Sequence, residues 1–243
     1  TFVMYAFYAR INMGRVMEVP LKRPGFEVDV PALLRLRAKL LFLASPNNPT
    51  GNAFAPGDLE KLVMGSKGLV VIDEAYADFC GQDFSRRTGE FDNLVVLRTF
   101  SKAHGLAGLR VGYAVAGEAV IETLDRVKPP FDVGTLSQEI ALEALKDRTF
   151  LHESCRIIAS ERERLTHELR TFDFEPQRSD ANFMLIDFKR PARGVRTFLE
   201  TRGIAIRDLS EFPGLETFGR VTIGRPEHQK MLLAALRDLP CLT

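Results

Sequence analysis

The sequence predicts an α/β protein with a mostly parallel central sheet flanked by helices, followed by a small C-terminal α+β domain. The first observation behind this prediction is a set of four short aliphatic runs, none of which alternates between apolar and polar residues. Runs of that kind are typical of strands buried on both faces of a parallel sheet. The four runs are 40–44, 69–72, 94–97 and 111–115.

The second observation is a helical segment between the first two runs. Leu59, Leu62 and Val63 are spaced as on one face of a short helix over 56–64. A strand, a helix and a strand in this order favour a parallel arrangement of the two strands.

From about residue 120 the pattern changes to long helical segments. Residues 135–151 contain neither Pro nor Gly, and 153–172 continues with apolar residues at helical intervals. We therefore expect a large domain over 1–150 and a small α+β domain over 151–243. In the small domain the sequence predicts strands at 182–188, 204–207 and 220–223, and a helix at 195–202.

The composition gives no sign of a nucleic acid, membrane or metal partner. The formal net charge is only +1, and the apolar opening at 2–8 is too short to span a bilayer. Cys80, Cys155 and Cys241 are odd in number and scattered, and the four histidines show no ligand spacing with them. We therefore expect no disulfide framework, no metal site and a cytoplasmic location.

Polar residues that could bind a ligand or take part in a reaction directly follow the apolar runs. Residues 45–51 (SPNNPTG) follow the first run and 73–76 (DEAY) follow the second. Residues 98–102 (RTFSK) overlap the end of the third, and 105–110 (GLAGLR) come next. In open α/β sheets ligands bind outside the carboxyl ends of the strands, so these clusters predict one shared site.

The cluster around Lys102 suits a phosphate group. Thr99 and Ser101 offer hydroxyls, Arg110 offers a planar cation, and the glycines allow backbone N–H groups to approach closely. A lysine beside such a site could act as an amine nucleophile. The alternative is a solvated loop lysine and a surface arginine, which short motifs alone do not exclude.

Asp73, Tyr76 and Asn48 are the other candidates. An unpaired carboxylate at the end of a buried strand is costly, so Asp73 needs a cationic or N–H partner, such as a protonated pyridine nitrogen. Capping of a following helix is the alternative. Tyr76 would lie on the same side if the segment turns helically. Asn48 either directs its amide at a ligand oxygen or belongs to a simple tight turn.

Taken together, these motifs resemble those of the fold-type-I pyridoxal-phosphate (PLP) aminotransferases, and they are similar to the histidinol-phosphate aminotransferase branch. The resemblance covers essentially the whole chain. It rests on SPNNPTG at 45–51, DEAY at 73–76, RTFSKAHGLAGLRVG at 98–112, KPPF at 128–131, ANF at 181–183, GIAIRD at 203–208 and RVTIG at 220–224.

The resemblance implies the PLP-transferase fold and a set of cofactor contacts. Lys102 would form the Schiff base with PLP and act as the general base. Asp73 would pair with the pyridine nitrogen, and Asn48 and Tyr76 would contact the 3′-oxygen. The remaining implied contacts are with the cofactor phosphate, from Thr99, Ser101 and Arg110, and with the face of the pyridine ring, from Phe2.

It also implies substrate contacts and a homodimer. Arg220 would bind the α-carboxylate of glutamate, with support from Asn182, and Arg207 would bind the phosphate of histidinol phosphate. The expected reaction is amino transfer between L-histidinol phosphate and 2-oxoglutarate in histidine biosynthesis. Alternatives are a threonine-phosphate decarboxylase, an aromatic amino acid aminotransferase, or an inactive PLP-binding fragment.

Two departures from the family pattern bear on the activity. The family has a substantial segment before the position of Phe2, which supplies further phosphate contacts and a tyrosine that reaches the neighbouring subunit. We therefore expect the sequence to be a truncated form, so the activity of the chain itself is a separate question. Residues 132–134 (DVG) stand where the family commonly has asparagines.

Overall fold

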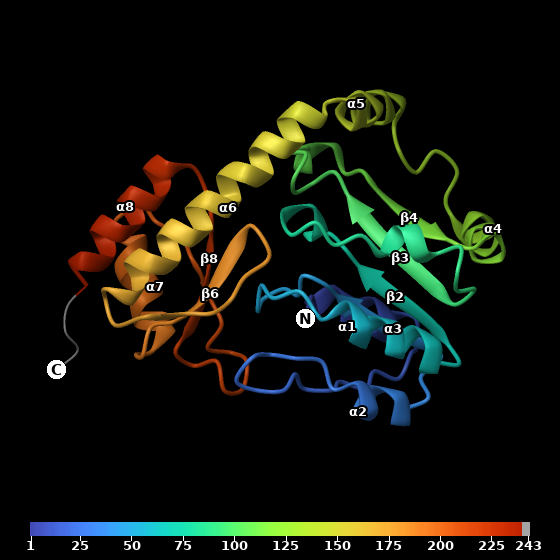
Figure 1. The fold of residues 1–243 in the computed structure, drawn as a ribbon, viewed down its shortest axis with the longest axis horizontal. Helices are drawn as coiled ribbons and strands as arrows, with labels where there is room; N and C mark the ends of the chain where they lie inside the picture. The colour runs from blue at the N-terminus through green and yellow to red at the C-terminus, as the bar shows by residue number, and fades with distance from the viewer. Residues whose placement is uncertain (240–243) are drawn as a thin grey trace.

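The chain is built around two four-stranded sheets, which the long helix α6 (Arg148–Arg170) connects (Figure 1). The structure is a computed structural model that describes residues 1–239, so Cys241 lies outside the described residues. In Figure 1, α6 runs diagonally from the end of α5 to the second sheet and its helices.

The first sheet has the strand order β1-β2-β3-β4. Its first three strands are parallel, and β4 runs antiparallel to β3. This confirms all four strands predicted from the aliphatic runs and the mostly parallel arrangement. The strands are β1 (Leu40–Ala44), β2 (Leu69–Asp73), β3 (Leu94–Thr99) and β4 (Gly112–Ala116).

The expectation of burial on both faces holds for the central strands and is wrong for the outer ones. Val70, Ile72 and Leu94 are inaccessible to solvent, whereas Leu40 on β1 and Tyr113 on β4 are exposed. Each outer strand of this sheet has a hydrogen-bonded neighbour on only one side, so its side chains are less covered.

Helices accompany the first sheet along the chain. The predicted helix over 56–64 is confirmed as α3, whose Leu59 packs with Val70 and Ile72 in one hydrophobic core. The other elements of this region are α1 (Val3–Ile11), α2 (Val30–Arg35), α3 (Pro56–Gly65), η1 (Ala77–Phe79), η2 (Phe84–Arg87), η3 (Ala107–Leu109), α4 (Glu118–Val127) and α5 (Thr135–Lys146).

Helix α1 packs on the face of this sheet that is opposite to α3. The ring of Tyr5 on α1 stacks on Phe42 of β1, with ring centroids 5.1 Å apart and planes 16° apart. Phe42 lies opposite Val71 in the register, and Ala44 lies opposite Asp73. Because side chains alternate along a strand, Asp73 points to the same face as Val71 and Phe42. The carboxylate is thereby directed towards α1.

The predicted helix over 135–151 is shorter than expected, because it breaks at Asp147. Helix α5 ends at Lys146, and the Asp147 side chain accepts a hydrogen bond of 2.9 Å from the backbone N–H of Phe150. An aspartate in that position caps a new helix, α6. Whether the chain divides into domains near residue 150 stays a prediction.

The second sheet is antiparallel, with the order β5-β6-β8-β7. The strands expected at 182–188 and 220–223 are confirmed as β6 and β8, and the helix at 195–202 as α7. The strand expected over 204–207 is wrong, because pairing with β8 starts only at Arg207. The elements are β5 (Glu175–Pro176), β6 (Phe183–Asp187), α7 (Ala192–Glu200), β7 (Arg207–Asp208), β8 (Phe218–Thr222) and α8 (Pro226–Arg237).

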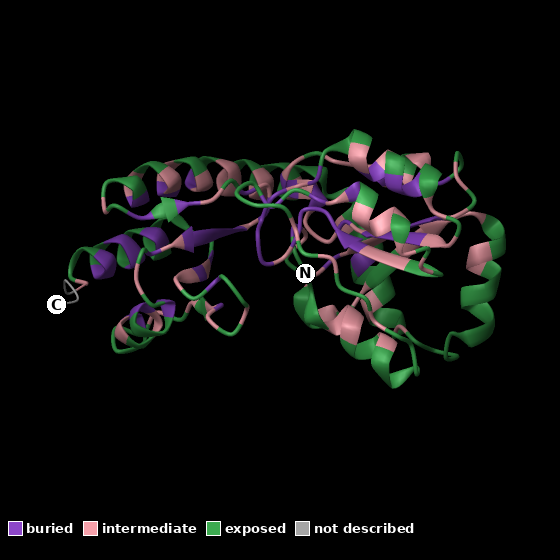
Figure 2. Cartoon of the chain, turned by 90° about the horizontal axis from the view of Figure 1, so that it is seen from below, coloured by how far each residue is buried: buried purple, intermediate pink, exposed green. Residues whose placement is uncertain are grey.

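The two faces of the second sheet have different environments. Met184 and Ile186 of β6 and Val221 of β8 pack against α6, α7 and α8 in one core. The alternate residues, Phe183 on β6 and Arg220 on β8, therefore lie on the other face. Figure 2 shows buried residues concentrated on the strands, with exposed faces on the helices. Within residues 1–239, no helix is long and apolar enough to cross a membrane.

Candidate active site

The loop after β1 is held in place from within and presents Asn48. The Asn47 side chain donates a hydrogen bond of 2.8 Å to Thr50 Oγ1, and the backbone N–H of Gly51 donates to the Asn47 carbonyl at 2.7 Å. Asn48 projects from this loop, and its Oδ1 accepts a short hydrogen bond from Arg220 Nη1 on β8. The tight turn predicted here is present, and Asn48 is in addition hydrogen-bonded to Arg220 of the second sheet.

Asp73, at the end of β2, has a partner at each carboxylate oxygen. Oδ1 accepts from the backbone N–H of Ala75 at 2.9 Å, and Oδ2 accepts a short hydrogen bond from the hydroxyl of Tyr5. The first contact is a local turn of the kind that aspartate makes with its own backbone. The capping alternative is wrong, because the N-cap residue of the following helix η1 is Tyr76, which makes no side-chain capping hydrogen bond. The second oxygen of Asp73 binds a side chain from α1.

Tyr76 and Lys102 lie together. Lys102 Nζ is 5.2 Å from the centroid of the Tyr76 ring, and the same ring packs edge-on against Phe183 of β6, with centroids 5.0 Å apart. Lys102 is exposed, and within residues 1–239 its ammonium has no hydrogen bond or ion pair. The exposure of Lys102 matches the alternative of a solvated loop lysine, while its position over Tyr76 places the amine beside a second residue of the predicted site.

The predicted phosphate-binding residues follow the end of β3. The backbone N–H of Ser101 donates to Thr99 Oγ1 at 3.1 Å, which turns the chain after the strand. Arg110 has a left-handed backbone conformation with φ 57°, and its guanidinium donates to the Ala107 carbonyl at 2.8 Å. Arg110 is exposed, so the other N–H groups of its guanidinium are accessible to an anion.

Two arginines face each other on the second sheet. Arg207 of β7 lies directly opposite Arg220 of β8 in the antiparallel register, so their side chains extend from the same face. The Arg220 guanidinium lies over the ring of Phe183, 5.1 Å from its centroid. Burial lowers the pKa of Arg220, and the positive charge of Arg207 also acts to lower it. Two like charges in this position favour a bound anion.

The segment before β6 connects this face to the loop after β1. The backbone N–H of Asp180 donates to the Gly51 carbonyl at 2.8 Å, and the backbone N–H of Ala53 donates to Asp180 Oδ2 at 2.8 Å. Asn182 follows, and its carbonyl accepts from the N–H of Ile223 at 2.8 Å. The two sheets are thereby joined next to Asn48 and Arg220.

Phe2 occupies the N-cap position just before α1 and makes no side-chain capping hydrogen bond. Its ring packs edge-on against Tyr5, with centroids 5.5 Å apart and planes 84° apart, and 44% of the residue is exposed. Its ring therefore lies beside the tyrosine that binds Asp73 and remains accessible.

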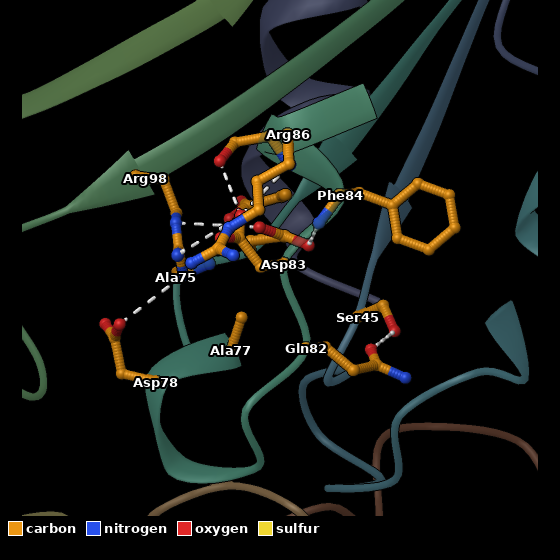
Figure 3. A network of polar contacts seen from close by, with 12 residues as sticks. Ser45, Ala75, Ala77, Asp78, Gln82, Asp83, Phe84, Arg86 and Arg98 are labelled. Carbon is orange, nitrogen blue, oxygen red and sulfur yellow. Dashed lines mark hydrogen bonds and ion pairs between the residues drawn. The ribbon is translucent and has the colours of Figure 1, made fainter. Parts of the chain in front are cut away.

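A partly buried ionic network adjoins the ends of β2 and β3 (Figure 3). Arg98 of β3 is 3.5 Å from Glu74 Oε2 and from Asp78 Oδ1, and 3.7 Å from Asp83 Oδ1. Glu74 is only 1% exposed, and its Oε1 accepts from the backbone N–H of Phe84 at 2.7 Å. Burial raises the pKa of Glu74 to about 7, against the opposing effects of the Phe84 N–H and Arg98. The network fixes Glu74, the neighbour of Asp73, against β3.

The set of side chains fits PLP. A carboxylate suits a protonated pyridine nitrogen, a lysine amine suits an aldehyde, and hydroxyls with an arginine suit a phosphate. The observation that supports the fit is the accessible ammonium of Lys102, which lies beside Tyr76 and has no ionic or hydrogen-bond partner in the described part of the chain. Among residues 1–239, no group of three or more His, Cys, Asp or Glu residues is arranged to hold a metal ion.

The sequence reasoning missed three residues of this region. Tyr5 binds Asp73, Phe183 contacts both Tyr76 and Arg220, and Arg98 binds Glu74. Tyr5 had a detectable signal, since it is three residues after Phe2 and therefore on the same side of a helix. The contacts of Phe183 and Arg98 had no signal, because they depend on how distant segments pack.

The chain is similar to known proteins over nearly its whole length. A sequence model of the family described as Aminotransferase class I and II matches residues 1–236. The chain is 41% identical to the histidinol-phosphate aminotransferase of Thermoanaerobacter pseudethanolicus, covering 98% of this chain and 69% of that protein. It is 43% identical to the histidinol-phosphate aminotransferase of Thermococcus kodakarensis, covering 96% and 67%.

Solved structures give a similar result. The structure of histidinol-phosphate aminotransferase from Sinorhizobium meliloti, in complex with pyridoxal-5′-phosphate, matches with a TM-score of 0.88 at 25% identity, over 98% of this chain and 69% of that one. L-threonine-O-3-phosphate decarboxylase from Porphyromonas gingivalis matches with a TM-score of 0.80 at 26% identity, over 98% and 74%. The fold-type-I α/β architecture expected from the sequence is confirmed.

Proposed function

Since the chain belongs to the class I and II aminotransferase family, we propose that it catalyses PLP-dependent amino transfer from L-histidinol phosphate to 2-oxoglutarate, giving imidazole-acetol phosphate and glutamate in histidine biosynthesis. The relatives at about 40% identity carry the name of this activity. One structural observation supports it most strongly, and it concerns both sheets.

That observation is a continuous series of side-chain contacts from the first sheet to the second. Lys102 lies over Tyr76, Tyr76 packs on Phe183, Phe183 lies under Arg220, and Arg220 binds Asn48. An amine, a phenol, an amide and a guanidinium thus come together although they are far apart in the sequence. This is the combination that a reaction on an amino group beside an anionic group requires.

PLP, when bound, supplies an electron sink for the negative charge that develops on the substrate carbon. Asp73 would hold the pyridine nitrogen in its protonated form, because a carboxylate stabilises a neighbouring cation. Thr99, Ser101 and Arg110 would bind the phosphate. Asn48 and Tyr76 would donate to the 3′-oxygen, and the exposed ring of Phe2 would cover one face of the pyridine.

Lys102 would have two successive tasks. Its Nζ would hold the cofactor covalently, and as a free amine it would serve as a general base. In that role Nζ would accept the proton from the substrate carbon that bears the amino group. The position of Nζ over Tyr76 keeps the amine beside the residue proposed to contact the cofactor.

The arginine pair supports a substrate with anionic groups. Arg220, half-buried, would bind the α-carboxylate of glutamate, supported by Asn182, and the exposed Arg207 would bind the phosphate of histidinol phosphate. A guanidinium donates two parallel hydrogen bonds to either anion, and a lysine cannot reproduce this. Each anion would also relieve the repulsion between the two arginines.

Other activities remain candidates. A threonine-phosphate decarboxylase also acts on a phosphorylated substrate, and the Porphyromonas gingivalis decarboxylase is similar in structure to this chain. An aromatic amino acid aminotransferase would use the same cofactor contacts without a phosphate. A chain that binds PLP without turnover is the non-enzymatic alternative.

The test is a near-visible spectrum of the 243-residue chain mixed with PLP, before and after adding L-histidinol phosphate, followed by a glutamate assay with 2-oxoglutarate. We expect a protein-bound band that changes with the substrate, and glutamate formation. A band that does not respond to any amino donor would favour the inactive chain. Carbon dioxide from threonine phosphate without glutamate would favour the decarboxylase, and amino transfer only from phenylalanine or tyrosine would favour the aromatic enzyme.

We also propose that the protein is a cytoplasmic homodimer. Several large apolar side chains lie on the surface, among them Phe131, which is 99% exposed, and such surface commonly marks a protein interface. Cys80 and Cys155 are free thiols, which suits a reducing compartment. Sedimentation analysis tests the dimer, and a mass of a single 27.3 kDa chain at micromolar concentration would argue against it.

A further inference from the structure

Tyr5 contacts the group that is proposed to bind the pyridine nitrogen, but it has no role in the function described so far. Its hydroxyl donates to Asp73 Oδ2, while Asp73 Oδ1 accepts from the backbone N–H of Ala75. The carboxylate is therefore fixed at both oxygens by the chain itself. Each ionised oxygen can accept two hydrogen bonds, so Oδ2 keeps a free acceptor position for a ligand.

The position of the Tyr5 hydroxyl is itself fixed by packing. The ring is stacked on Phe42 of β1 at 5.1 Å and is bordered by the edge of Phe2 at 5.5 Å. Phe42 and Asp73 lie on the same face of the first sheet, as the register requires. A stacked ring has few alternative orientations, so the hydroxyl stays directed at the carboxylate.

Burial raises the pKa of Tyr5 far above its ordinary value, and the charge of Asp73 and their hydrogen bond raise it further. The hydroxyl therefore keeps its proton at every pH at which the enzyme works, and it remains a donor. Helix α1 thus supplies two groups from one turn, the exposed ring of Phe2 and the hydrogen-bond donor of Tyr5.

We propose that Tyr5 is a positioning residue that orients the Asp73 carboxylate towards the cofactor's pyridine nitrogen and weakens its attraction for the proton there. This inference rests on the proposed PLP chemistry. A donor to a carboxylate stabilises its ionised form, so the proton stays on the nitrogen. Without the hydroxyl, Asp73 would lose the contact that fixes Oδ2 and would become a stronger proton acceptor.

The test compares Tyr5→Phe with Tyr8→Phe. Tyr8 is on the same helix, is 57% exposed and makes no hydrogen bond to Asp73, so it is a matched control. Phenylalanine keeps the ring that stacks on Phe42 and removes only the hydroxyl. We expect Tyr5→Phe to weaken PLP binding roughly five- to tenfold, which is somewhat less than the change in affinity expected when a full hydrogen bond to a charged group is lost. Tyr8→Phe should leave PLP binding unchanged.

A second measurement reports on the proton directly. With PLP labelled with ¹⁵N at the ring nitrogen, the resonance of the bound cofactor should move towards the unprotonated value in Tyr5→Phe and stay in place in Tyr8→Phe. If both variants match the parent in affinity and in chemical shift, the role of Tyr5 is wrong. If the parent itself binds no PLP, the proposed function is wrong. That outcome differs from failure of the Tyr5 role alone, in which the parent and both variants bind PLP equally well.

The contact can also be tested in the cofactor-free chain without replacing Tyr5. A phenolic proton shared with a carboxylate gives a downfield proton resonance, which should be present in the parent and lost in Asp73→Asn. This measurement decides the matter if Tyr5→Phe does not fold. A downfield resonance that persists in Asp73→Asn would assign the proton to another donor and overturn the proposal.

Discussion

Arg207 and Arg220 lie directly opposite each other on the neighbouring antiparallel strands β7 and β8. Like charges in this position destabilise a sheet, and nothing in the pairing of the strands requires them. Burial lowers the pKa of Arg220, and the charge of Arg207 works in the same direction. An anion bound between or beside the two guanidinium groups, as proposed for the substrate, would relieve this repulsion.

The first prediction follows from this pair. Arg207→Ala should lower kcat/KM for histidinol phosphate roughly 10- to 100-fold, because the phosphate loses a charged hydrogen-bond partner, and should affect glutamate much less. The same change should raise the free energy of unfolding by roughly 0.5 kcal/mol, because the repulsion disappears. Steady-state kinetics and thermal melts measure the two effects. Arg193→Ala, an exposed arginine on α7, is the control, and equal losses for both substrates would contradict the role.

The second prediction concerns Lys102. Lys102→Ala should abolish covalent attachment of PLP, because no other amine among residues 1–239 lies over Tyr76, while the proposed non-covalent contacts at Asp73 and Asn48 should remain. Borohydride reduction followed by mass spectrometry detects the adduct. Lys67→Ala, which changes an exposed lysine just before β2, should keep the adduct. An adduct that persists in Lys102→Ala at another single lysine would move the assignment to that residue.

The third prediction concerns Gly51, at the end of the loop that carries Asn48. Gly51 has a φ of 86°, and a Cβ at this position would lie 2.8 Å from Ser179 Oγ. Gly51→Ala should therefore lower the free energy of unfolding by more than about 1 kcal/mol, because the side chain is strained and crowded. Gly57→Ala is the control, since Gly57 has open space around it and begins α3, where alanine is expected to add roughly 0.5 kcal/mol. Urea unfolding compares the two, and equal stabilities would contradict both the strain at this φ and the crowding by Ser179.

The fourth prediction concerns pH. Burial raises the pKa of Glu74 to about 7 in the folded chain, from 4.5 in an unfolded one. Between these values the folded state binds more protons than the unfolded state, so stability falls as the pH rises. The contribution of Glu74 is therefore fully present below pH 4.5 and is lost as the pH rises through about 7. The loss is on the order of 3 kcal/mol.

Glu74→Gln tests this expectation. Glutamine keeps an oxygen for the N–H of Phe84 but does not titrate. The free energy of unfolding should therefore fall less between pH 5 and 8 in the variant than in the parent, by on the order of 3 kcal/mol. Glu227→Gln, exposed on α8, should leave the slope unchanged. Thermal melts across the range provide the measurement. A slope in Glu74→Gln identical to that of the parent would show that Glu74 titrates normally.

The parts of the fold that the sequence predicts best are those with local causes. The strands β1 to β4 follow from aliphatic runs, and α3 follows from the spacing of Leu59 and Leu62. The short strand β7 was misplaced, because Ile204 and Ile206 pack against the core of the second sheet from outside a strand. The break at Asp147 was missed, because the pattern of apolar residues continues across a cap that depends on one side-chain hydrogen bond.

The sheet, its polar strand ends and the candidate side chains are predictable from local sequence, because a run of aliphatic residues followed by polar ones is a property of contiguous chain. The distant residues that complete the site are known only from the fold. Tyr5 reaches Asp73 across 68 positions, and Arg220 reaches Asn48 across 172. Contacts of that kind depend on how α1 covers the first sheet and how the second sheet is oriented towards it. They arise from packing between separate elements, which no local spacing of residues encodes.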